Sequence, residues 1–238
     1  MTVHFAEPCY EWQIGGLPLS GQTGVFRSFV GGRPALPPDV ALPACDLCGA
    51  RQTFFFQVAF PAGHSWAGRS VALFACTRCA DDAHVIPPML DGPLAGADIP
   101  NGFLDAAQVN YRTVVFPTAD GRVREEYTPA VAFRTITLRS APPDVPANKV
   151  GGDPTWLLED EAPASYAGRA GMTFLLQLLP DTHFDIEPGA PPQAVIGLNG
   201  QPTVTGKPYY ELFVGNAVYL FGTARPADPR VYVLTQVI

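Results

Sequence analysis

The sequence predicts an all-β protein with few short helices, and three features point to that class. Gly and Pro supply 23 + 26 = 49 residues, about a fifth of the chain, and both interrupt helices. Short apolar runs bounded by these residues recur along the chain, which is typical of buried strands. Amphipathic runs of helical periodicity are scarce. Apolar residues make up 47% of the chain, which is enough for a globular core.

The expected elements are short and follow the apolar runs in order. Residues 54–59 and 173–179 are the richest runs, and each is soon followed by Pro. Helix is expected only near 81–84 and 103–109. Hairpin turns, which need residues that tolerate positive φ, are expected at Asp120-Gly121, Asn199-Gly200 and Gly215-Asn216. Further strands are expected at 71–76, 111–116, 123–127, 131–139, 194–198, 209–214, 217–221 and 231–237.

An internal repeat organises these elements. The motif Val-Gly-Gly-x-Pro at 30–34 recurs at 150–154, a spacing of 150 − 30 = 120 residues. At this spacing residues 30–58 share ten identities in 29 positions with the second copy. A further match, at a larger spacing, relates 71–74 to 218–221. Self-similarity of this kind indicates a duplicated structural unit.

The repeat predicts two similar β-lobes that pack as one unit. The boundary is expected in the Pro-rich stretch 140–148, which precedes the second copy and is too short and stiff to act as a flexible tether. The first lobe then spans 1–140 and the second 141–238.

Each copy carries the same structural motif, a GGxP turn followed by a Gln inside an apolar strand. A buried amide must be hydrogen-bonded, so we expect each Gln to hold the backbone of its own turn; the alternative is contact with a client strand. Trp156, beside the second turn, is interpreted as a core residue, with a partner contact as the alternative. The motif residues are Gly31, Gly32, Pro34 and Gln57 in the first copy, and Gly151, Gly152, Pro154 and Gln177 in the second.

Four cysteines in the first lobe predict a metal site. Cys45 and Cys48 form one C-x-x-C motif, Cys76 and Cys79 form another, and 27 residues separate the two. A strand hairpin between the motifs would bring them together as zinc-ribbon-like knuckles, giving Zn²⁺ four sulfur ligands. Four thiolates leave no position for water, so the expected Zn²⁺ is structural. The alternatives are redox disulfides or simple buried thiols.

The second lobe lacks these ligands, and the other candidate ligands are scattered. His84 is either an auxiliary metal neighbour or a solvated loop residue, and His183 with Asp185 resembles a fragment of a metal site. Cys9 stands alone as a free thiol. The positions equivalent to the four cysteines hold Ser165, Gly168, Thr223 and Pro226.

Taken together, these motifs resemble two known families. The GGxP turn, the C-x-x-C-G knuckle and the Phe-x-Phe-Gln strand of the first copy are similar to the programmed cell death 2 protein family. The second copy, with 149–156, 172–177 and 215–221, resembles the bacterial YwqG-like family of unknown function. The resemblance implies a duplicated β-rich fold, and because programmed cell death 2 relatives act as chaperones for a ribosomal protein, it also implies a chaperone-like role.

Charge and motif content narrow the function class. The net charge of −7 disfavours nucleic acid and favours a protein or peptide client of basic character. No secretory signal is apparent in 1–12 and no segment is apolar enough to span a membrane, so the expected location is the cytoplasm. No nucleophile-elbow, P-loop, dinucleotide-binding or HExxH motif occurs. We therefore expect a non-enzymatic binding protein; the alternative is a small-molecule-binding or hydrolytic protein that uses the cleft between the lobes.

Overall fold

A computed structural model describes residues 7–15, 22, 27–224 and 228–237. The prediction of an all-β chain with few short helices is confirmed. Within the described part the α-helical content is the single turn α1 (Phe103–Ala106). The described 3₁₀ turns are η1 (Asp82–His84), η2 (Thr118–Asp120) and η3 (Leu212–Gly215). None of the described helices has the length and apolarity needed to cross a bilayer.

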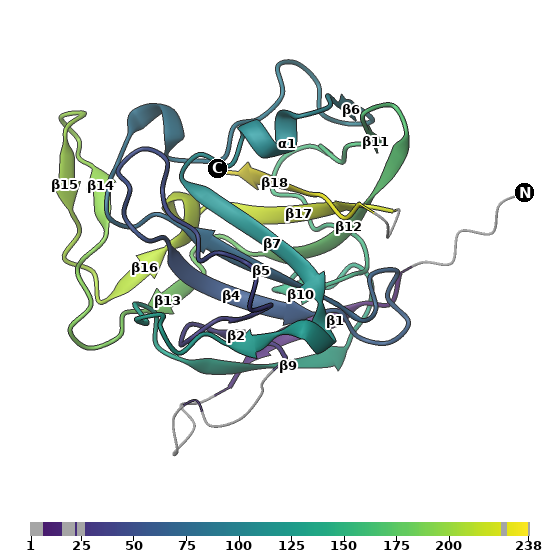
Figure 1. The fold of residues 1–238 in the computed structure, drawn as a ribbon. Coiled ribbons are helices and arrows are strands. Elements are labelled where there is room, and N and C mark those ends of the chain that lie inside the picture. The colour runs from purple at the N-terminus through teal and green to yellow at the C-terminus, as the bar shows by residue number, and fades with distance from the viewer. Residues whose placement is uncertain (1–6, 16–21, 23–26, 225–227, 238) are drawn as a thin grey trace, which may run out of the picture.

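One long sheet runs through both halves of the chain (Figure 1). Its strands come from distant parts of the sequence and follow one hydrogen-bonded path. In spatial order they are β18 (Val231–Gln236), β17 (Ala217–Thr223), β12 (Ala170–Leu178), β10 (Lys149–Val150), β1 (Tyr10–Ile14), β9 (Arg134–Ser140), β2 (Phe29–Val30), β4 (Thr53–Ala59), β5 (Arg69–Ala75) and β7 (Tyr111–Pro117).

The centre of this path is the antiparallel pair β1–β9, in which Gln13 lies opposite Thr137. On its other side β1 pairs with β10 of the second half, whereas β9 pairs with β2 of the first half. Thus β1, which precedes the first half in the chain, pairs with a strand of the second half, and β9, which precedes the second half, pairs with a strand of the first. We call this arrangement the strand exchange. Hydrogen bonding is continuous across the predicted boundary at 140–148, and the division into two lobes stays a prediction.

The two halves use the same strand register. Phe29 lies opposite Gln57 in the first half, and Lys149 lies opposite Gln177 in the second. A β-bulge interrupts both long strands at matching places, between Phe54 and Phe56 and between Phe174 and Leu176. Residues 120 positions apart thus match in strand pairing as well as in sequence. A common origin of the halves stays a prediction.

The two repeated glutamines occupy equivalent hydrogen-bonding positions. The Oε1 of Gln57 accepts from the Ala35 backbone N–H at 3.2 Å, and its Nε2 donates to the Arg27 carbonyl at 3.4 Å. The Oε1 of Gln177 accepts from the Thr155 N–H at 2.8 Å, and its Nε2 donates to the Ala147 carbonyl at 2.9 Å. Each amide thus satisfies backbone groups on both sides of its GGxP turn.

Lys149 ties the Pro-rich stretch to the second turn, a role that the sequence did not suggest. Its side chain is fully buried, and burial lowers the pKa of the ammonium group. The Nζ donates to the carbonyls of Pro143 and Val145 and to the Thr155 hydroxyl at 2.9–3.0 Å. Because a buried ammonium group is costly unless all its donors are used, this lysine fixes the path of the chain between the halves.

Short strand pairs complete the fold, and they correct two predicted hairpins. The separate short pairs are β3 (Ala35–Leu36) with β8 (Arg122–Val123), β13 (His183–Asp185) with β16 (Tyr209–Glu211), and β14 (Ala194–Ile196) with β15 (Pro202–Val204). In addition, β11 (Ser165–Tyr166) pairs with β12 and with β6 (Asp98–Ile99) and so extends the long sheet. The turn at Asn199-Gly200 does join paired strands, β14 and β15. Asp120-Gly121 does not close a hairpin, because the following strand, β8, pairs with β3 instead of β7. Gly215-Asn216 does not close one either, because β16 pairs with β13 instead of β17.

The largest apolar core is shared by the two halves. It contains Phe55 and Leu73 from the first half together with Leu175 and Val233 from the second. We call the part of the long sheet in each half of the chain a half-sheet. The outer face of each half-sheet carries a smaller apolar cluster of its own. Because alternate strand residues face opposite sides of a sheet, the inward residues of both halves meet in one interior and join the halves into one folding unit.

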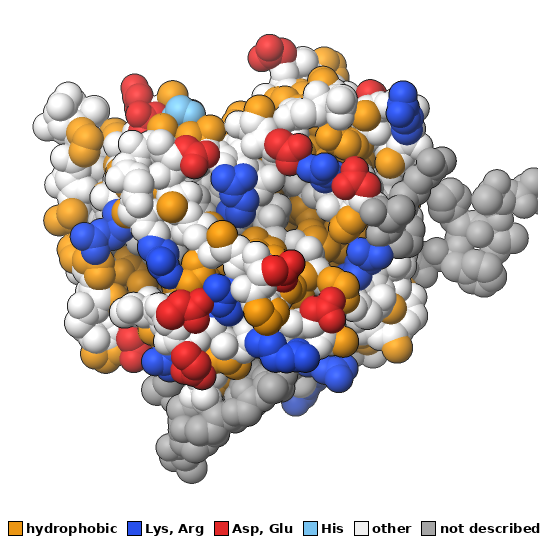
Figure 2. Space-filling view, viewed as in Figure 1, with side chains coloured by type: hydrophobic (Ala, Val, Ile, Leu, Met, Phe, Trp, Pro, Cys, Tyr) orange, Lys and Arg blue, Asp and Glu red, His pale blue; other side chains and the backbone are white. Residues whose placement is uncertain are grey.

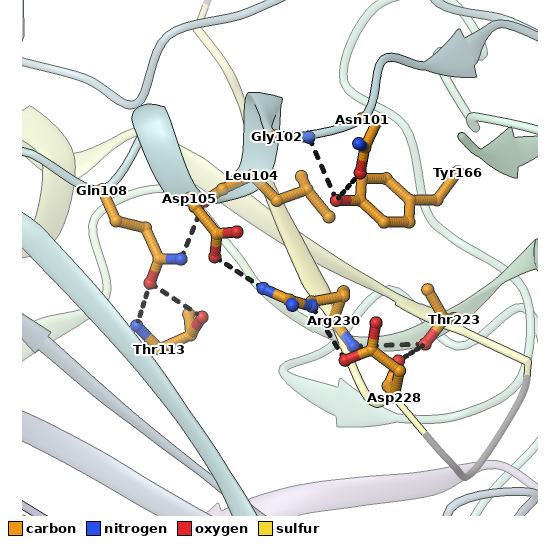
Figure 3. Close-up of polar contacts among 10 residues, drawn as sticks. All are labelled: Asn101, Gly102, Leu104, Asp105, Gln108, Thr113, Tyr166, Thr223, Asp228 and Arg230. Carbon is orange, nitrogen blue, oxygen red and sulfur yellow. Dashed lines mark hydrogen bonds and ion pairs between the residues drawn. The ribbon is translucent and has the colours of Figure 1, made fainter.

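A segment from the first half covers the outer face of the second (Figure 3). Arg230 donates to the carboxylate of Asp105 on α1 at 2.6 Å, and the Tyr166 hydroxyl accepts from the Gly102 N–H at 3.2 Å. Leu104 is buried in the apolar cluster beneath these contacts. The stretch 86–105 thus covers the outer face of the sheet in the second half.

Trp66 and His64 form a second connection between the halves. The Trp66 indole N–H donates to the Thr223 carbonyl at 3.1 Å, and its ring packs where Gly222 leaves room. The Nδ1 of His64 accepts from the Trp66 backbone N–H at 3.0 Å, which requires the neutral imidazole. Its Nε2 has no hydrogen-bond partner among the described residues.

Acid should therefore destabilise the fold through His64. Burial lowers the pKa of His64 below its ordinary 6.5, although Glu7 partly opposes this. The unfolded chain takes up this proton below pH 6.5 while the folded chain does not, so stability falls as the pH drops. The loss approaches about 1.4 kcal/mol per pH unit. We expect His64→Gln to remove this slope in urea unfolding between pH 7.5 and 5.5, whereas the exposed His183→Gln keeps it; equal slopes in both variants would refute the assignment.

Candidate metal centre and adjoining cleft

The four predicted cysteines come together at one end of β4 and β5. The first knuckle, Cys45 to Cys48, precedes β4, and the second, Cys76 to Cys79, follows β5. The two strands are antiparallel, with Thr53 opposite Ala75. This register places the beginning of β4 beside the end of β5 and so sets the two knuckles next to each other.

The geometry of the four sulfurs fits a tetrahedral metal. The Sγ atoms of Cys45 and Cys79 are 3.8 Å apart, those of Cys48 and Cys76 are 3.7 Å apart, and those of Cys76 and Cys79 are 3.5 Å apart. A tetrahedron with Zn–S bonds of about 2.3 Å has edges of about 3.8 Å. Among the described residues, these four thiols form a group whose ligand atoms all lie within 4.8 Å of one another. The cysteines could hold a metal ion, and the all-sulfur donor set suits Zn²⁺.

Backbone hydrogen bonds shape the two knuckles. The Gly49 N–H donates to the Cys45 carbonyl at 2.8 Å, and Gly49 has φ +71°, a conformation that favours glycine. In the second knuckle the Arg78 N–H donates to the Cys76 sulfur at 3.4 Å. Donors directed at sulfur stabilise thiolates, which are the form that binds metal.

Burial opposes ionisation of two of the four thiols. Burial raises the pKa of Cys76 to about 11, and burial together with the neighbouring thiols raises that of Cys79. Burial would also raise the pKa of Cys48, but a hydrogen bond from the Ala50 backbone and bonds with the other thiols lower it overall. Four adjacent thiolates need a positive charge among them, and a bound divalent ion supplies that charge.

The candidate histidines lie outside this group of four. The His84 Nδ1 is 2.7 Å from the Asp81 carboxylate, beside a small cavity that Cys76 and Cys79 also line. His183 does not form a site with Asp185, because that carboxylate is 2.7 Å from the Arg134 guanidinium.

His183 instead lies close to two other carboxylates, Asp181 and Glu211, with all three ligand atoms within 4.8 Å. The Lys207 ammonium group is already 2.7 Å from Glu211 and supplies a positive charge there. Glu211 reaches His183 through the pairing of β13 with β16, a contact that nothing in the sequence spacing indicates.

The other predicted positions have structural contacts. The Ser165 hydroxyl and the Gly168 N–H both bond to Asp98, and the Thr223 hydroxyl donates to the Asp228 carbonyl. Pro226 lies outside the described residues. Cys9 is buried beside Gly152. Trp156 packs on the outer face of the second half-sheet, with its ring centre 4.6 Å from that of Tyr219 and stacked over Phe221.

A cleft that sequence reasoning did not locate opens beside the knuckles. It has a volume of about 820 Å³ and is open to solvent. One wall comes from the second knuckle, with Arg78, and from residues 50–53 after the first knuckle, with Arg51; the other comes from residues 128–130 and 187–191. Residues 187–191 belong to the second half of the chain, whereas the rest of this lining belongs to the first. On the face that carries β7, basic side chains are set among acidic and apolar ones (Figure 2).

Interactions between the halves keep the second wall in place. Val131 and Ile186 form an isolated β-bridge, and the Glu187 N–H donates to the Ala130 carbonyl at 2.8 Å. The Ala194 N–H donates to the Thr77 carbonyl at 2.9 Å, next to the second knuckle. The cleft therefore has rigid borders on both sides.

No family model matches the chain, and no curated protein is similar enough to match it.

Proposed function

We propose that this protein is a non-enzymatic binding module in which a structural Zn²⁺, held by Cys45, Cys48, Cys76 and Cys79, fixes one wall of a cleft for an extended segment of a partner protein. The observation that carries the proposal is the position of the 820 Å³ cleft. One wall contains Thr77 and Arg78 of the second knuckle and residues 50–53, which directly follow the first knuckle. A structural metal at that point would set the shape of the binding surface.

Binding is favoured over catalysis by the chemistry of both features. Four thiolates around Zn²⁺ leave no coordination position for water or substrate. The described residues that line the cleft include no histidine and no cysteine, the residue types that most often act as a base or as an activated nucleophile. What remains on the walls is guanidinium, carboxylate, hydroxyl and proline, which suit recognition.

The family resemblance supports a chaperone-like version of this role in the cytoplasm. The programmed cell death 2 and YwqG-like motifs coincide with the GGxP turns and the knuckles, and Arg33 of the first turn and Arg78 of the second knuckle line the cleft. Proline residues on the second wall limit its flexibility, and a stiff cleft binds an extended chain with less loss of entropy. Neither a nucleic acid nor a membrane is the expected partner.

A small molecule is the second candidate ligand, and one observation favours it. The cleft volume of about 820 Å³ falls within the range of roughly 300–1,000 Å³ that is usual for small-molecule sites. In this reading the protein stores, carries or hydrolyses the molecule between its two halves.

Site-specific photo-crosslinking tests the proposal. A photoreactive amino acid at Thr128, in the cleft wall, is expected to capture a discrete partner protein in cells, and Arg78→Gln is expected to reduce that capture. The same amino acid at Leu198, an exposed tip of the β14–β15 hairpin, is the matched control. Equal capture at both positions would contradict the proposal. Absence of capture together with stabilisation of the protein by a fraction of cellular metabolites would favour the small-molecule reading.

A further inference from the structure

We infer that the cleft selects an acidic segment, whose carboxylates bind the guanidinium groups of Arg51 and Arg78. This inference rests on the proposed function and names the chemistry of its ligand. It departs from the basic client that net charge alone suggests. The net charge of −7 describes the whole surface, whereas a ligand in the cleft meets the wall that carries these two arginines.

The two knuckles present both arginines directly. Arg78 lies between the two cysteines of the second knuckle, and Arg51 follows the first knuckle, where its backbone bridges to Ala44. Both residues are exposed. In the described part of the chain neither guanidinium forms a hydrogen bond, and neither has a carboxylate within 4 Å. By contrast, Arg124, Arg134 and Arg230 are each within 2.7 Å of a carboxylate oxygen.

The acidic side chains near the cleft are distributed unevenly. Glu126 is engaged by Arg124 at 2.6 Å, and Arg33 has a looser contact of 3.5 Å with Glu125. Glu187 lies on the opposite wall, and no hydrogen bond or ion pair of its carboxylate is found among the described residues. The cleft lining therefore carries three guanidinium groups and two carboxylates, with Arg51 and Arg78 on the knuckle wall and Glu187 on the opposite wall. Arg51 also interacts electrostatically with Glu126, whereas Arg78 and Glu187 are left for a ligand.

This polarity indicates how a ligand would lie. Carboxylates would bind at the knuckle wall, where guanidinium groups form bidentate, charge-assisted hydrogen bonds. Proline and alanine on the opposite wall, such as Pro129 and Pro188, would contact the apolar parts of the segment. Glu187 would repel any acidic residue turned toward it. A segment in which acidic and small apolar residues alternate meets both requirements, because alternate side chains of an extended chain point to opposite sides.

Fluorescence anisotropy with defined peptides tests the inference. The probe is a labelled ten-residue peptide of alternating Glu and Ala, compared with peptides in which Gln, Lys or phosphoserine replaces Glu. We expect the Glu peptide to bind the zinc-loaded protein about tenfold more tightly than the Gln peptide, since an exposed guanidinium–carboxylate pair strengthens binding about threefold and the cleft offers two such pairs. Binding should weaken as salt is raised, because these groups are exposed.

Variants with opposite expected effects make the test specific. Arg51→Gln and Arg78→Gln should each weaken binding of the Glu peptide about threefold with unchanged zinc content. Glu187→Gln should strengthen it, because a repulsive charge is removed. Arg139→Gln is the matched control: it removes one positive charge from β9, outside the cleft lining, and should leave the affinity unchanged.

The outcomes separate this inference from the proposed function. If the Gln or Lys peptide binds as tightly as the Glu peptide and still depends on cleft residues, the acidic selectivity is wrong and the binding role stands. If no peptide binds, both fail. If the phosphoserine peptide alone binds and inorganic phosphate displaces it, the ligand is a phosphorylated segment and the inference is overturned.

Discussion

Cys76→Ser is expected to abolish metal binding and to lower the free energy of unfolding by about 4 kcal/mol or more. The three remaining thiols cannot complete a closed tetrahedral site, and metal binding contributes directly to folding free energy where the ligands are assembled only in the folded chain. The loss of structure should be concentrated near the knuckles, because the rest of the β4–β5 hairpin is still held by its packing in the shared core. Zinc content by elemental analysis and urea unfolding at fixed protein concentration measure the two effects.

Cys9→Ser provides the matched control for this experiment. It makes the same chemical change at a buried thiol that does not belong to the group of four, so zinc content should remain at one ion per chain. Hydrogen exchange should rise at the beginning of β4 and the end of β5 in Cys76→Ser and should not rise there in Cys9→Ser. Purified wild-type protein without zinc, or a Cys76→Ser variant as stable as the parent, would contradict the structural metal.

The grouping of the four cysteines could be predicted from the sequence because the information that brings them together is local. Each C-x-x-C turn presents two thiols, and a hairpin of apolar strands between the turns was visible in residues 54–59 and 71–76. The two turns then come together if the strands between them pair, and β4 and β5 do pair. For the same reason the strands with long apolar runs were expected close to where they lie.

The cleft could not be predicted, because its walls depend on contacts between distant parts of the chain. Arg51 and Glu187 are far apart in the sequence, yet both line the cleft. They do so because the bridge between Val131 and Ile186 and the contacts around it bring residues 187–191 to the cleft. The exchange of leading strands escaped prediction for a related reason. Residues 10–14 include Glu11 and Gln13, and this polarity is unusual for a central strand. They nevertheless form β1 in the middle of the sheet, where β10 pairs with one edge of β1 and β9 with the other.

The strand exchange also explains why the GGxP turns need glycine. Gly151 has φ +69°, and a Cβ placed there would lie 2.1 Å from the carbonyl oxygen of Pro8, just before β1. In the first half a Cβ on Gly31 would lie 2.4 Å from the carbonyl oxygen of Ala132, just before β9. In both halves, therefore, the turn is crossed at very close range by the strand that leads into the other half.

We therefore expect Gly151→Ala to cost about 3–5 kcal/mol of unfolding free energy, part from the left-handed backbone and most from the displaced β1. Gly168→Ala separates the two contributions. Gly168 has a similar φ of +63°, but a Cβ there would meet nothing within 4 Å, so only the conformational cost of about 1 kcal/mol should appear. Urea unfolding of both variants measures the difference. If the two substitutions lower the free energy of unfolding equally, β1 can move aside without cost. The close approach of the two halves would then not be the reason that the repeat contains these glycines.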